Sequence, residues 1–293
     1  MERAEIEKVI QDQREETVRW ARRAIVDRSE TSQINLQSDL AQVVLGVRRS
    51  GKSTLCQTAL LKDKRPFAYL NFDDNRLTRF TGEDLDVALE LLYKHYGAFD
   101  CLFLDEAQNV PEWHLFVNRL LRQGLHLLVT GSNAKLLSGE LATHMTGRYH
   151  RVELFPFSFK DYCVWKGVSP DGGSTRACGL RQGALDAYLH MGGFPELLRE
   201  AGGAPEYLAS LMNDVLERDI RQRHAIRQMG TFRDVATYLM DVAPTTLNCN
   251  TVASRLGRAC SSNTVRTYVE YLKQAYLLQS VPRWSTKSHE RLR

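Results

Sequence analysis

Long apolar runs and closely paired cysteines are both absent from this sequence of 293 residues. No segment of about 18 apolar residues occurs, so we expect no transmembrane helix, and the charged N-terminus does not resemble a signal peptide. No two cysteines form a C-x-x-C pair, which argues against a zinc site; the six are Cys56, Cys101, Cys163, Cys178, Cys249 and Cys260. These absences predict a cytoplasmic protein with no membrane partner.

A large excess of charge, internal repeats and low-complexity tracts are also lacking. The net charge of +4 is too small to indicate nucleic-acid binding by itself, although the pI near 8.7 favours it slightly. Hydrophobic residues make up 43% of the chain, which supports a real core and argues against wholesale disorder. The length predicts one large or two ordinary domains.

The stretch GVRRSGKS at residues 46–53 fits the phosphate-binding pattern G-x-x-x-x-G-K-[ST] at every fixed position. The apolar, β-branched segment 40–45 before it is typical of a buried parallel strand, and residues 54–61 after it have helical composition. Strand, glycine loop and helix form the context that the pattern requires. The alternative is a glycine-rich turn that precedes a lysine by chance.

This loop predicts a binding site for ATP with Mg²⁺. Glycines let successive N–H groups point into one concavity, to which the helix N-terminus adds its positive dipole end. Lys52 is expected to reach the β- and γ-phosphates, and the Ser53 hydroxyl to ligate Mg²⁺. Arg48 and Arg49 either add charge near the phosphates or hold a lid. The full predicted set is Gly46, Arg48, Arg49, Ser50, Gly51, Lys52, Ser53 and Thr54.

An apolar strand at residues 99–104 ends in two carboxylates, Asp105 and Glu106, which is the Walker B pattern. Ligands of open α/β sheets bind at the carboxyl ends of the strands. Asp105 is therefore expected to hold Mg²⁺ through water or through Ser53, and Glu106 to act as general base on the attacking water. The alternative is an acidic strand end without chemistry.

Another buried strand, residues 125–130, runs into Gly131, Ser132 and Asn133. Ser132 or Asn133 is placed to lie between the Walker B carboxylates and the γ-phosphate and to sense its loss. The alternative is an ordinary strand-to-helix turn in which Ser132 or Asn133 caps the helix.

Further strands at 66–72 and 150–155 alternate with helices at 85–96 and 113–121. This alternation, with an extra strand between the P-loop and Walker B, predicts an α/β fold: a parallel sheet with helices on both faces. Residues 2–28 predict an amphipathic helix, whose exposed side is solvated or contacts nucleic acid. Its basic residues are Arg14, Arg19, Arg22, Arg23 and Arg28.

The chain becomes helical after a predicted loop at 167–179. The glycines and proline of GGFPE, residues 192–196, break two helices, and further helices are expected at 205–228 and 232–242. A short helix at 250–257, a second capped by residues 261–263, and a strand at 277–281 predict a winged helix-turn-helix. This end of the chain is basic, which suits DNA, whereas winged helices also pack against proteins. Its basic residues are Arg255, Arg258, Arg266, Lys273, Arg283, Lys287, Arg291 and Arg293.

The motifs GVRRSGKSTL, YLNFDD, CLFLDEAQ, VTGSNAKLLSG, TGRYHRVELFPFSFKDY and GGFPE occur in this order. Together they resemble bacterial and archaeal AAA+/STAND-like P-loop ATPases that carry a C-terminal domain of unknown function, and the resemblance covers roughly residues 35–282. It implies a nucleotide-binding sheet of the ASCE/AAA+ type, a helical lid and a winged helix. We expect domains at 1–30 (N-terminal helix), 31–165 (ATPase core), 180–230 (lid) and 231–293 (winged helix).

The resemblance also implies roles for single residues. Ser132 or Asn133 would be sensor 1, and Arg148 a finger-like arginine acting in its own subunit or across an interface. Gly193 and Pro195 match an element that lines the adenine side. Members of the family usually continue past the winged helix into a further domain, often nuclease-like, so this chain is either a short variant or trimmed.

Three functions compete at this point. The first is a slow, partner-stimulated ATPase that couples nucleotide state to rearrangement of domains acting on DNA or a protein partner. The second is a nucleotide-gated DNA-binding regulator or sensor with slow turnover. The third, a small-molecule kinase, agrees less well with a helical lid followed by a winged helix. ATP and ADP, DNA, and a homo-oligomeric or other protein partner are the expected interactions.

Overall fold

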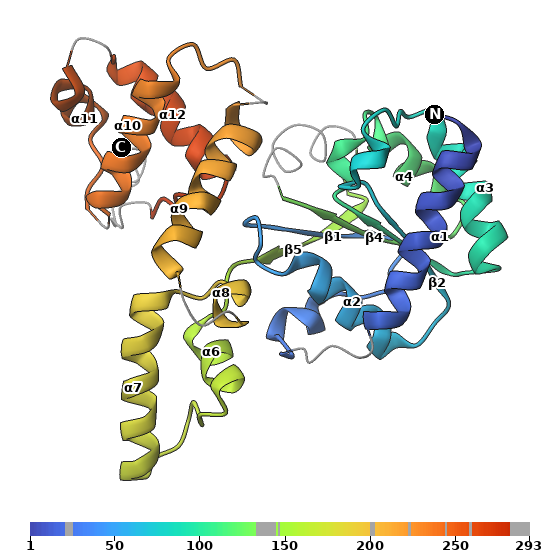
Figure 1. Cartoon of the computed structure of the whole chain (residues 1–293), viewed down its shortest axis with the longest axis horizontal. Helices are drawn as coiled ribbons and strands as arrows, with labels where there is room; N and C mark the ends of the chain where they lie inside the picture. Colours follow the sequence, from blue (N-terminus) through green and yellow to red (C-terminus); the bar gives the residue numbers. More distant parts are fainter. Residues whose placement is uncertain are drawn as a thin grey trace. The chain divides into compact units, whose positions relative to one another are not determined.

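The computed structural model (Figure 1) describes residues 1–20, 26–132, 145, 147–199, 203–221, 224–243, 245–257 and 260–281. The chain divides into two compact units, Met1–Ala204 and Pro205–Arg293. The boundary falls inside the range 180–230 predicted as a lid. Of the helices in the described ranges, none combines the length and the hydrophobicity that crossing a bilayer requires.

The first unit is built on a five-stranded sheet whose paired strands all run parallel, in the order β2-β3-β4-β1-β5. The strands are β1 (Ala41–Gly46), β2 (Phe67–Asn71), β3 (Cys101–Asp105), β4 (His126–Gly131) and β5 (Tyr149–Leu154). The prediction of an α/β fold with a parallel sheet is therefore confirmed. In space, β4 lies between the P-loop strand β1 and the Walker B strand β3.

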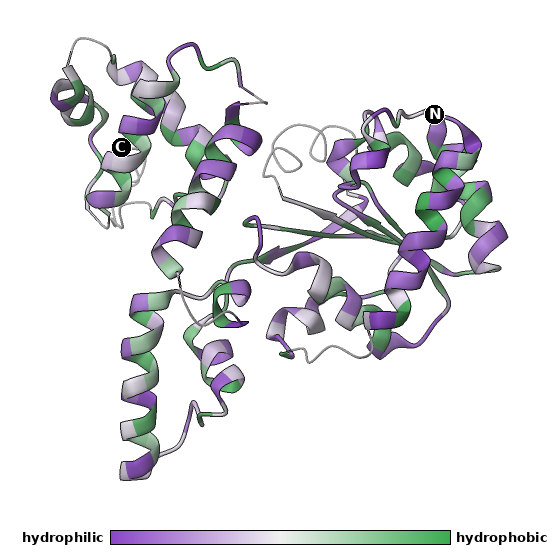
Figure 2. Cartoon of the chain, in the orientation of Figure 1, coloured by the Kyte–Doolittle hydropathy of each residue, from purple (hydrophilic) through white to green (hydrophobic). Residues whose placement is uncertain are grey.

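Helices cover both faces of this sheet, because successive strand residues point to opposite sides. Val43 and Leu45 of β1 belong to one core cluster with apolar residues of α1 (Arg3–Trp20), α3 (Asp84–Tyr96) and α4 (Trp113–Arg122). Val44 between them belongs to a second cluster, with Leu55 and Leu60 of α2 (Lys52–Asp63). Figure 2 shows hydrophobic colouring along the central strands and mixed colouring along the helices around them.

Gly46 ends β1 where this strand lies against β5. It pairs with Leu154, and a Cβ at Gly46 would lie 1.9 Å from the Leu154 carbonyl oxygen. Its φ of 150° is also a value that side chains of other residues disfavour. A glycine therefore lets the chain leave the sheet at this point and enter the P-loop.

Three helices complete the first unit: α6 (Phe159–Lys166), α7 (Thr175–Met191) and α8 (Pro195–Arg199). Phe157, Tyr162 and Leu198 form a small core cluster there. Ser158 caps α6 in a capping box with Asp161, and α7 ends before Gly192, whose φ is 77°. The helix break predicted at residues 192–196 is confirmed, whereas the loop predicted at 167–179 is shorter, because Ser174 already caps α7.

The second unit contains α9 (Ala204–Asp214), a π-helical stretch at Val215–Arg221, α10 (Met229–Asp241), α11 (Cys249–Leu256) and α12 (Ser262–Gln274). The Phe232 and Tyr268 rings pack edge to face, 5.0 Å apart. Ser261 caps α12 by accepting from the Thr264 amide over 3.1 Å, as predicted. Helix at 224–228 was expected, but these residues are not helical.

The strand predicted at residues 277–281 is wrong. The amides of Leu277 and Leu278 both donate to the Leu272 carbonyl, at 2.9 and 3.4 Å, and Tyr276 has a φ of 60°. These apolar residues therefore close the C-terminus of α12 in place of pairing with another strand. The helix pair of the predicted winged helix is present, but its wing is not among the described residues.

Arg28 corrects the prediction for the N-terminal helix. It was expected on the basic, exposed side, together with Arg14, Arg19, Arg22 and Arg23. In the structure Arg28 is extended, with φ −103° and ψ 146°, and 7% exposed. Arg22 and Arg23 lie outside the described residues.

Candidate functional site

The P-loop connects β1 to α2 and curls around the Lys52 ammonium. Arg49 and Gly51 both have left-handed backbone, with φ of 62° and 95°, and the Ser50 amide donates to the Val47 carbonyl over 3.2 Å. Lys52 Nζ lies 3.1 Å from Val47 O and 3.4 Å from Gly46 O, with the side chain 4% exposed. The ammonium is thus held inside the loop, at the N-terminus of a helix.

A cavity of about 350 Å³ opens over this loop. The P-loop residues 49–54 and Glu106 line one part of it. The remaining wall includes Val26, Arg28, Phe157, Trp165, Pro195 and Glu196. The cavity therefore joins backbone donors and a cation, which suit phosphates, to aromatic and aliphatic surface, which suits a base.

Asp105 connects the two Walker motifs. Its Oδ1 accepts from Ser53 Oγ over 3.0 Å and from Thr130 Oγ1, and its Oδ2 accepts from Tyr69 OH over 3.2 Å. Burial, together with the Glu106 carboxylate beside it, raises the pKa of Asp105 to about 6, although its three hydrogen bonds oppose this rise. The carboxylate and hydroxyl oxygens are hard donors of the kind that Mg²⁺ takes, so Ser53 and Asp105 fit a magnesium site.

Glu106 follows with a left-handed backbone, φ 53° and ψ 45°, which costs about 1–2 kcal/mol for such a residue. Its amide donates to Thr130 Oγ1 over 2.9 Å. Its Oε2 accepts from Gln108 Nε2 and, over 3.3 Å, from the Ser132 amide, while Oε1 lies 3.9 Å from Lys52 Nζ. The carboxylate is thus held at one oxygen and faces the P-loop lysine with the other.

The structure brings most of the predicted site residues together. Ser132 contacts Glu106 as described, whereas Asn133, the other sensor candidate, lies outside the described residues. Pro195 lines the cavity, and its Cγ would lie 3.9 Å from a Cβ on Gly51. The Gly193 carbonyl accepts from the Phe157 amide over 2.7 Å.

The two arginines of the loop differ. Arg49 Nη1 lies 2.5 Å from Glu196 Oε2 in α8, which falls in the range 180–230 expected to form a lid. Arg48 is half-buried and does not line the cavity.

Arg148 lies at the amino-terminal ends of β1 and β5, whereas the P-loop lies at the carboxyl ends of the strands. Its carbonyl accepts from the Ala41 amide at the start of β1, over 3.0 Å, whereas the P-loop follows Gly46 at the other end. The intervening strand spans about 16 Å at about 3.3 Å per residue. The structure therefore does not bring Arg148 to the P-loop of its own subunit, and a role as a finger-like arginine stays a prediction.

Besides part of the cavity wall, the polar site residues Arg28, Tyr69, Gln108 and Thr130 were not predicted. Gln108 lies in the DEAQ motif, so its proximity to Glu106 was visible in the sequence. Thr130 follows Val129, which pairs with Leu104, and this register places Thr130 beside Asp105. Thr130 could not be predicted from the motifs, because they do not give the register between strands that are distant in sequence.

Comparison with known proteins agrees with this geometry. Residues 38–163 match the model of an AAA domain family, and residues 182–293 match a domain of unknown function (DUF8612). A Walker-type ATPase of Pyrococcus abyssi has a similar structure, with a TM-score of 0.50 and 16% identity over 86% of this chain and 90% of that one. The family match supports an AAA domain at residues 38–163, and the structural likeness supports the same kind of fold.

Two curated relatives are similar in sequence and are themselves uncharacterized. One, from Methanocaldococcus jannaschii, is 30% identical and the match covers 87% of this chain and 59% of the relative. The other, from Haemophilus influenzae, is 27% identical over 85% of this chain and 64% of the relative. The chain thus spans about six-tenths of the length of the relatives it matches.

Proposed function

We propose that this protein binds ATP as its magnesium complex and hydrolyses it to ADP and phosphate. The observation that carries the proposal is the meeting of two motifs 52 residues apart, in which Ser53 Oγ donates to Asp105 over 3.0 Å. Glu106, the residue after Asp105, lies 3.9 Å from Lys52, the residue before Ser53. The phosphate-binding loop, the proposed metal ligands and the proposed general base thus lie around the same part of the cavity.

The roles follow from this arrangement. Lys52 and the amides at the start of α2 bind the β- and γ-phosphates. Ser53 and Asp105 would hold Mg²⁺, which would lower the charge repulsion between the phosphates and the attacking oxygen. Glu106 takes the proton of the attacking water through Oε1, while the Ser132 amide and Gln108 hold Oε2 and orient the carboxylate.

Phosphate release from ATP is the direct test. We expect slow release with ATP and Mg²⁺, and release at background level when EDTA exceeds Mg²⁺, because the triphosphate charge is then uncompensated. Release is followed with a phosphate-binding reporter. Purified protein that releases no phosphate, or releases it equally in EDTA, would contradict hydrolysis at this site.

We further propose that nucleotide state controls the second unit, which acts on DNA or on a protein partner. The α11–α12 helix pair supports this step, because α12 has a capped N-terminus and exposes a polar side. The exposed residues of α12 are Asn263, Arg266, Thr267 and Glu270.

A nucleotide-gated DNA-binding regulator with slow turnover is the second candidate, favoured by the same helix pair. Stimulation of phosphate release by DNA supports the first candidate, and unchanged release with DNA bound supports the second.

The salt dependence of binding tests whether DNA is the partner. If two or three phosphates are contacted, the logarithm of affinity falls against the logarithm of salt concentration with a slope of about −2 to −3. Arg266→Gln is expected to make this slope shallower by about 1, whereas Arg79→Gln, an exposed arginine of the first unit, leaves it unchanged. Fluorescence anisotropy of a labelled duplex measures both. No binding at low salt, or a flat slope, would contradict the proposal that DNA is the partner and would leave a protein partner as the alternative.

A further inference from the structure

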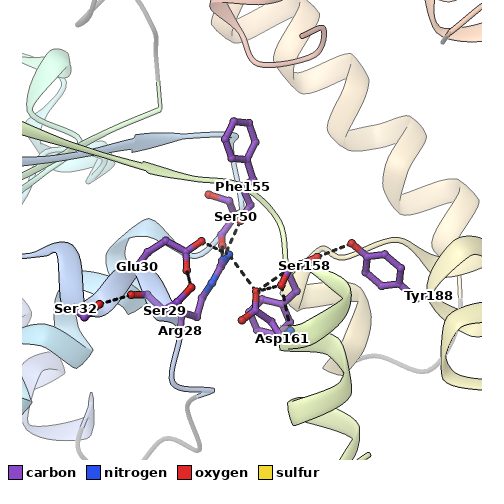
Figure 3. Close-up of polar contacts among 10 residues, drawn as sticks. Arg28, Ser29, Glu30, Ser32, Ser50, Phe155, Ser158, Asp161 and Tyr188 are labelled. Carbon is purple, nitrogen blue, oxygen red and sulfur yellow. Dashed lines mark hydrogen bonds and ion pairs between the residues drawn. The ribbon is translucent and has the colours of Figure 1, made fainter. Parts of the chain in front are cut away.

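Arg28 is a buried arginine that contacts both the P-loop and the end of the sheet (Figure 3). Its Nη1 donates to the Phe155 carbonyl over 3.0 Å and to the Ser50 carbonyl over 3.4 Å. Its Nη2 donates to Glu30 Oε1 over 3.1 Å and lies 3.6 Å from Asp161 Oδ2. The side chain is 6% exposed, and its guanidinium joins three segments: residues 28–30, the P-loop and residues 155–161.

The charges around Arg28 argue against a role as a phosphate-binding cation. Two carboxylates, Glu30 and Asp161, surround one guanidinium, so the trio carries a net negative charge. A buried arginine needs such partners, because desolvation of an unpaired charge is costly. Its Nη donors are directed at these acceptors and at backbone carbonyls. What Arg28 offers the nucleotide site is therefore the position of the Ser50 carbonyl.

That position matters because a glycine at position 51 permits the peptide plane between Ser50 and Gly51 to turn either way. In a planar trans peptide the carbonyl and the following N–H point in opposite directions. Holding the Ser50 carbonyl toward Arg28 therefore turns the Gly51 N–H away from it. Gly51 has a φ of 95°, and glycine tolerates both orientations of the preceding peptide plane at little cost. A contact from outside the loop is needed to select one of them.

A second series of contacts connects the residues around Arg28 to the P-loop. Asp161 closes the capping box on Ser158. The neighbouring Phe157 donates its amide to the Gly193 carbonyl over 2.7 Å and accepts at its own carbonyl from Tyr188 OH over 2.7 Å. Beyond Gly193, Glu196 pairs with Arg49 of the P-loop.

We propose that Arg28 is a positioning residue of the nucleotide site: it fixes the Ser50–Gly51 peptide in the orientation that presents the Gly51 N–H to phosphate, and it couples this peptide to the segment that runs from Phe155 to α8. The inference rests on the proposed binding of ATP. It assigns a function in that site to a residue of the N-terminal segment, outside both Walker motifs.

The test compares Arg28→Gln and Arg28→Lys with the wild type in steady-state phosphate release and in calorimetric titration with ADP. Loss of the guanidinium weakens ground-state and transition-state phosphate contacts alike, so KM for ATP rises about tenfold while kcat stays within about threefold. Arg28→Lys keeps a charge between the carboxylates but lacks the planar set of donors, so its KM is expected to lie between those of the wild type and Arg28→Gln. Arg3→Gln is the matched control, because Arg3 pairs with Glu90 at the exposed surface of α1.

The outcomes separate this inference from the proposed function. If the wild type binds no ADP, the proposed function fails and the inference fails with it. If the wild type binds and Arg28→Gln keeps the wild-type KM, only the inference is overturned. A merely structural role lowers kcat through loss of folded protein and leaves KM unchanged, which also overturns it. If Arg28→Gln does not fold, Arg28→Lys decides, and an unchanged KM in that variant overturns the inference.

Discussion

Lys52→Ala is expected to weaken ATP binding severely. The Lys52 side chain is 4% exposed, and its ammonium lies 3.9 Å from the Glu106 carboxylate, so an alanine removes a buried cation that is expected to face the phosphates. Truncating one partner of a buried, hydrogen-bonded charge pair costs about 2–5 kcal/mol. That range corresponds to a dissociation constant about thirty-fold to several thousand-fold larger. Calorimetric titration with ATP and Mg²⁺ measures the loss.

Lys62→Ala is the matched control for this variant. Lys62 belongs to the same helix, α2, but pairs with Asp27 over 2.6 Å at the surface, where both side chains are more than half exposed. Thermal unfolding gives a second readout, because a ligand at 100 times its dissociation constant stabilises the folded state by about 2.7 kcal/mol. ATP should raise the melting temperature of the wild type and of Lys62→Ala, but not that of Lys52→Ala. Unchanged ATP affinity in Lys52→Ala would refute the assignment of the P-loop.

The fold of the first unit could be predicted because its signals are local. The strands β1 to β4 are short, mainly apolar runs, and α2, α3 and α4 have periodic apolar sides, so segments such as Ala41–Gly46 and Cys101–Asp105 were placed within one or two residues. The strand expected at 277–281 shows the limit of such signals. Leu277 and Leu278 close α12 through backbone amides that donate to the Leu272 carbonyl, and an apolar run alone does not distinguish such a helix end from a strand.

Some residues of the site could likewise be predicted from the sequence, and others could not. Lys52, Ser53, Asp105 and Glu106 belong to contiguous motifs that follow strands, so the sheet topology alone brings them to one edge. Arg28 gave no such signal, because it follows a charged helix and its partners at Ser50, Phe155 and Asp161 are distant in sequence. The sequence left open where Arg148 lies relative to the nucleotide, because its motif fixes its order in the chain but not the end of the sheet where it lies.

Glu106→Gln is expected to retain ATP binding and to lose turnover by about two or more orders of magnitude, the scale of general-base catalysis. The amide keeps the size of the side chain and can still accept from the Ser132 amide, which lies 3.3 Å from Oε2. It cannot take a proton from water. Single-turnover measurements with ATP in the active site separate the chemical step from binding and product release.

Glu112→Gln controls for the unusual backbone of this position. Glu112 is exposed and, like Glu106, has a left-handed φ, 58° against 53°, so the two variants share any cost of placing glutamine there. Only Glu106→Gln removes a carboxylate from the cavity wall, so only it should slow the chemical step. If the chemical step of Glu106→Gln stays within about tenfold of the wild type, Glu106 is not the base, because loss of a base costs more. Hydrolysis would then depend on another group near the γ-phosphate.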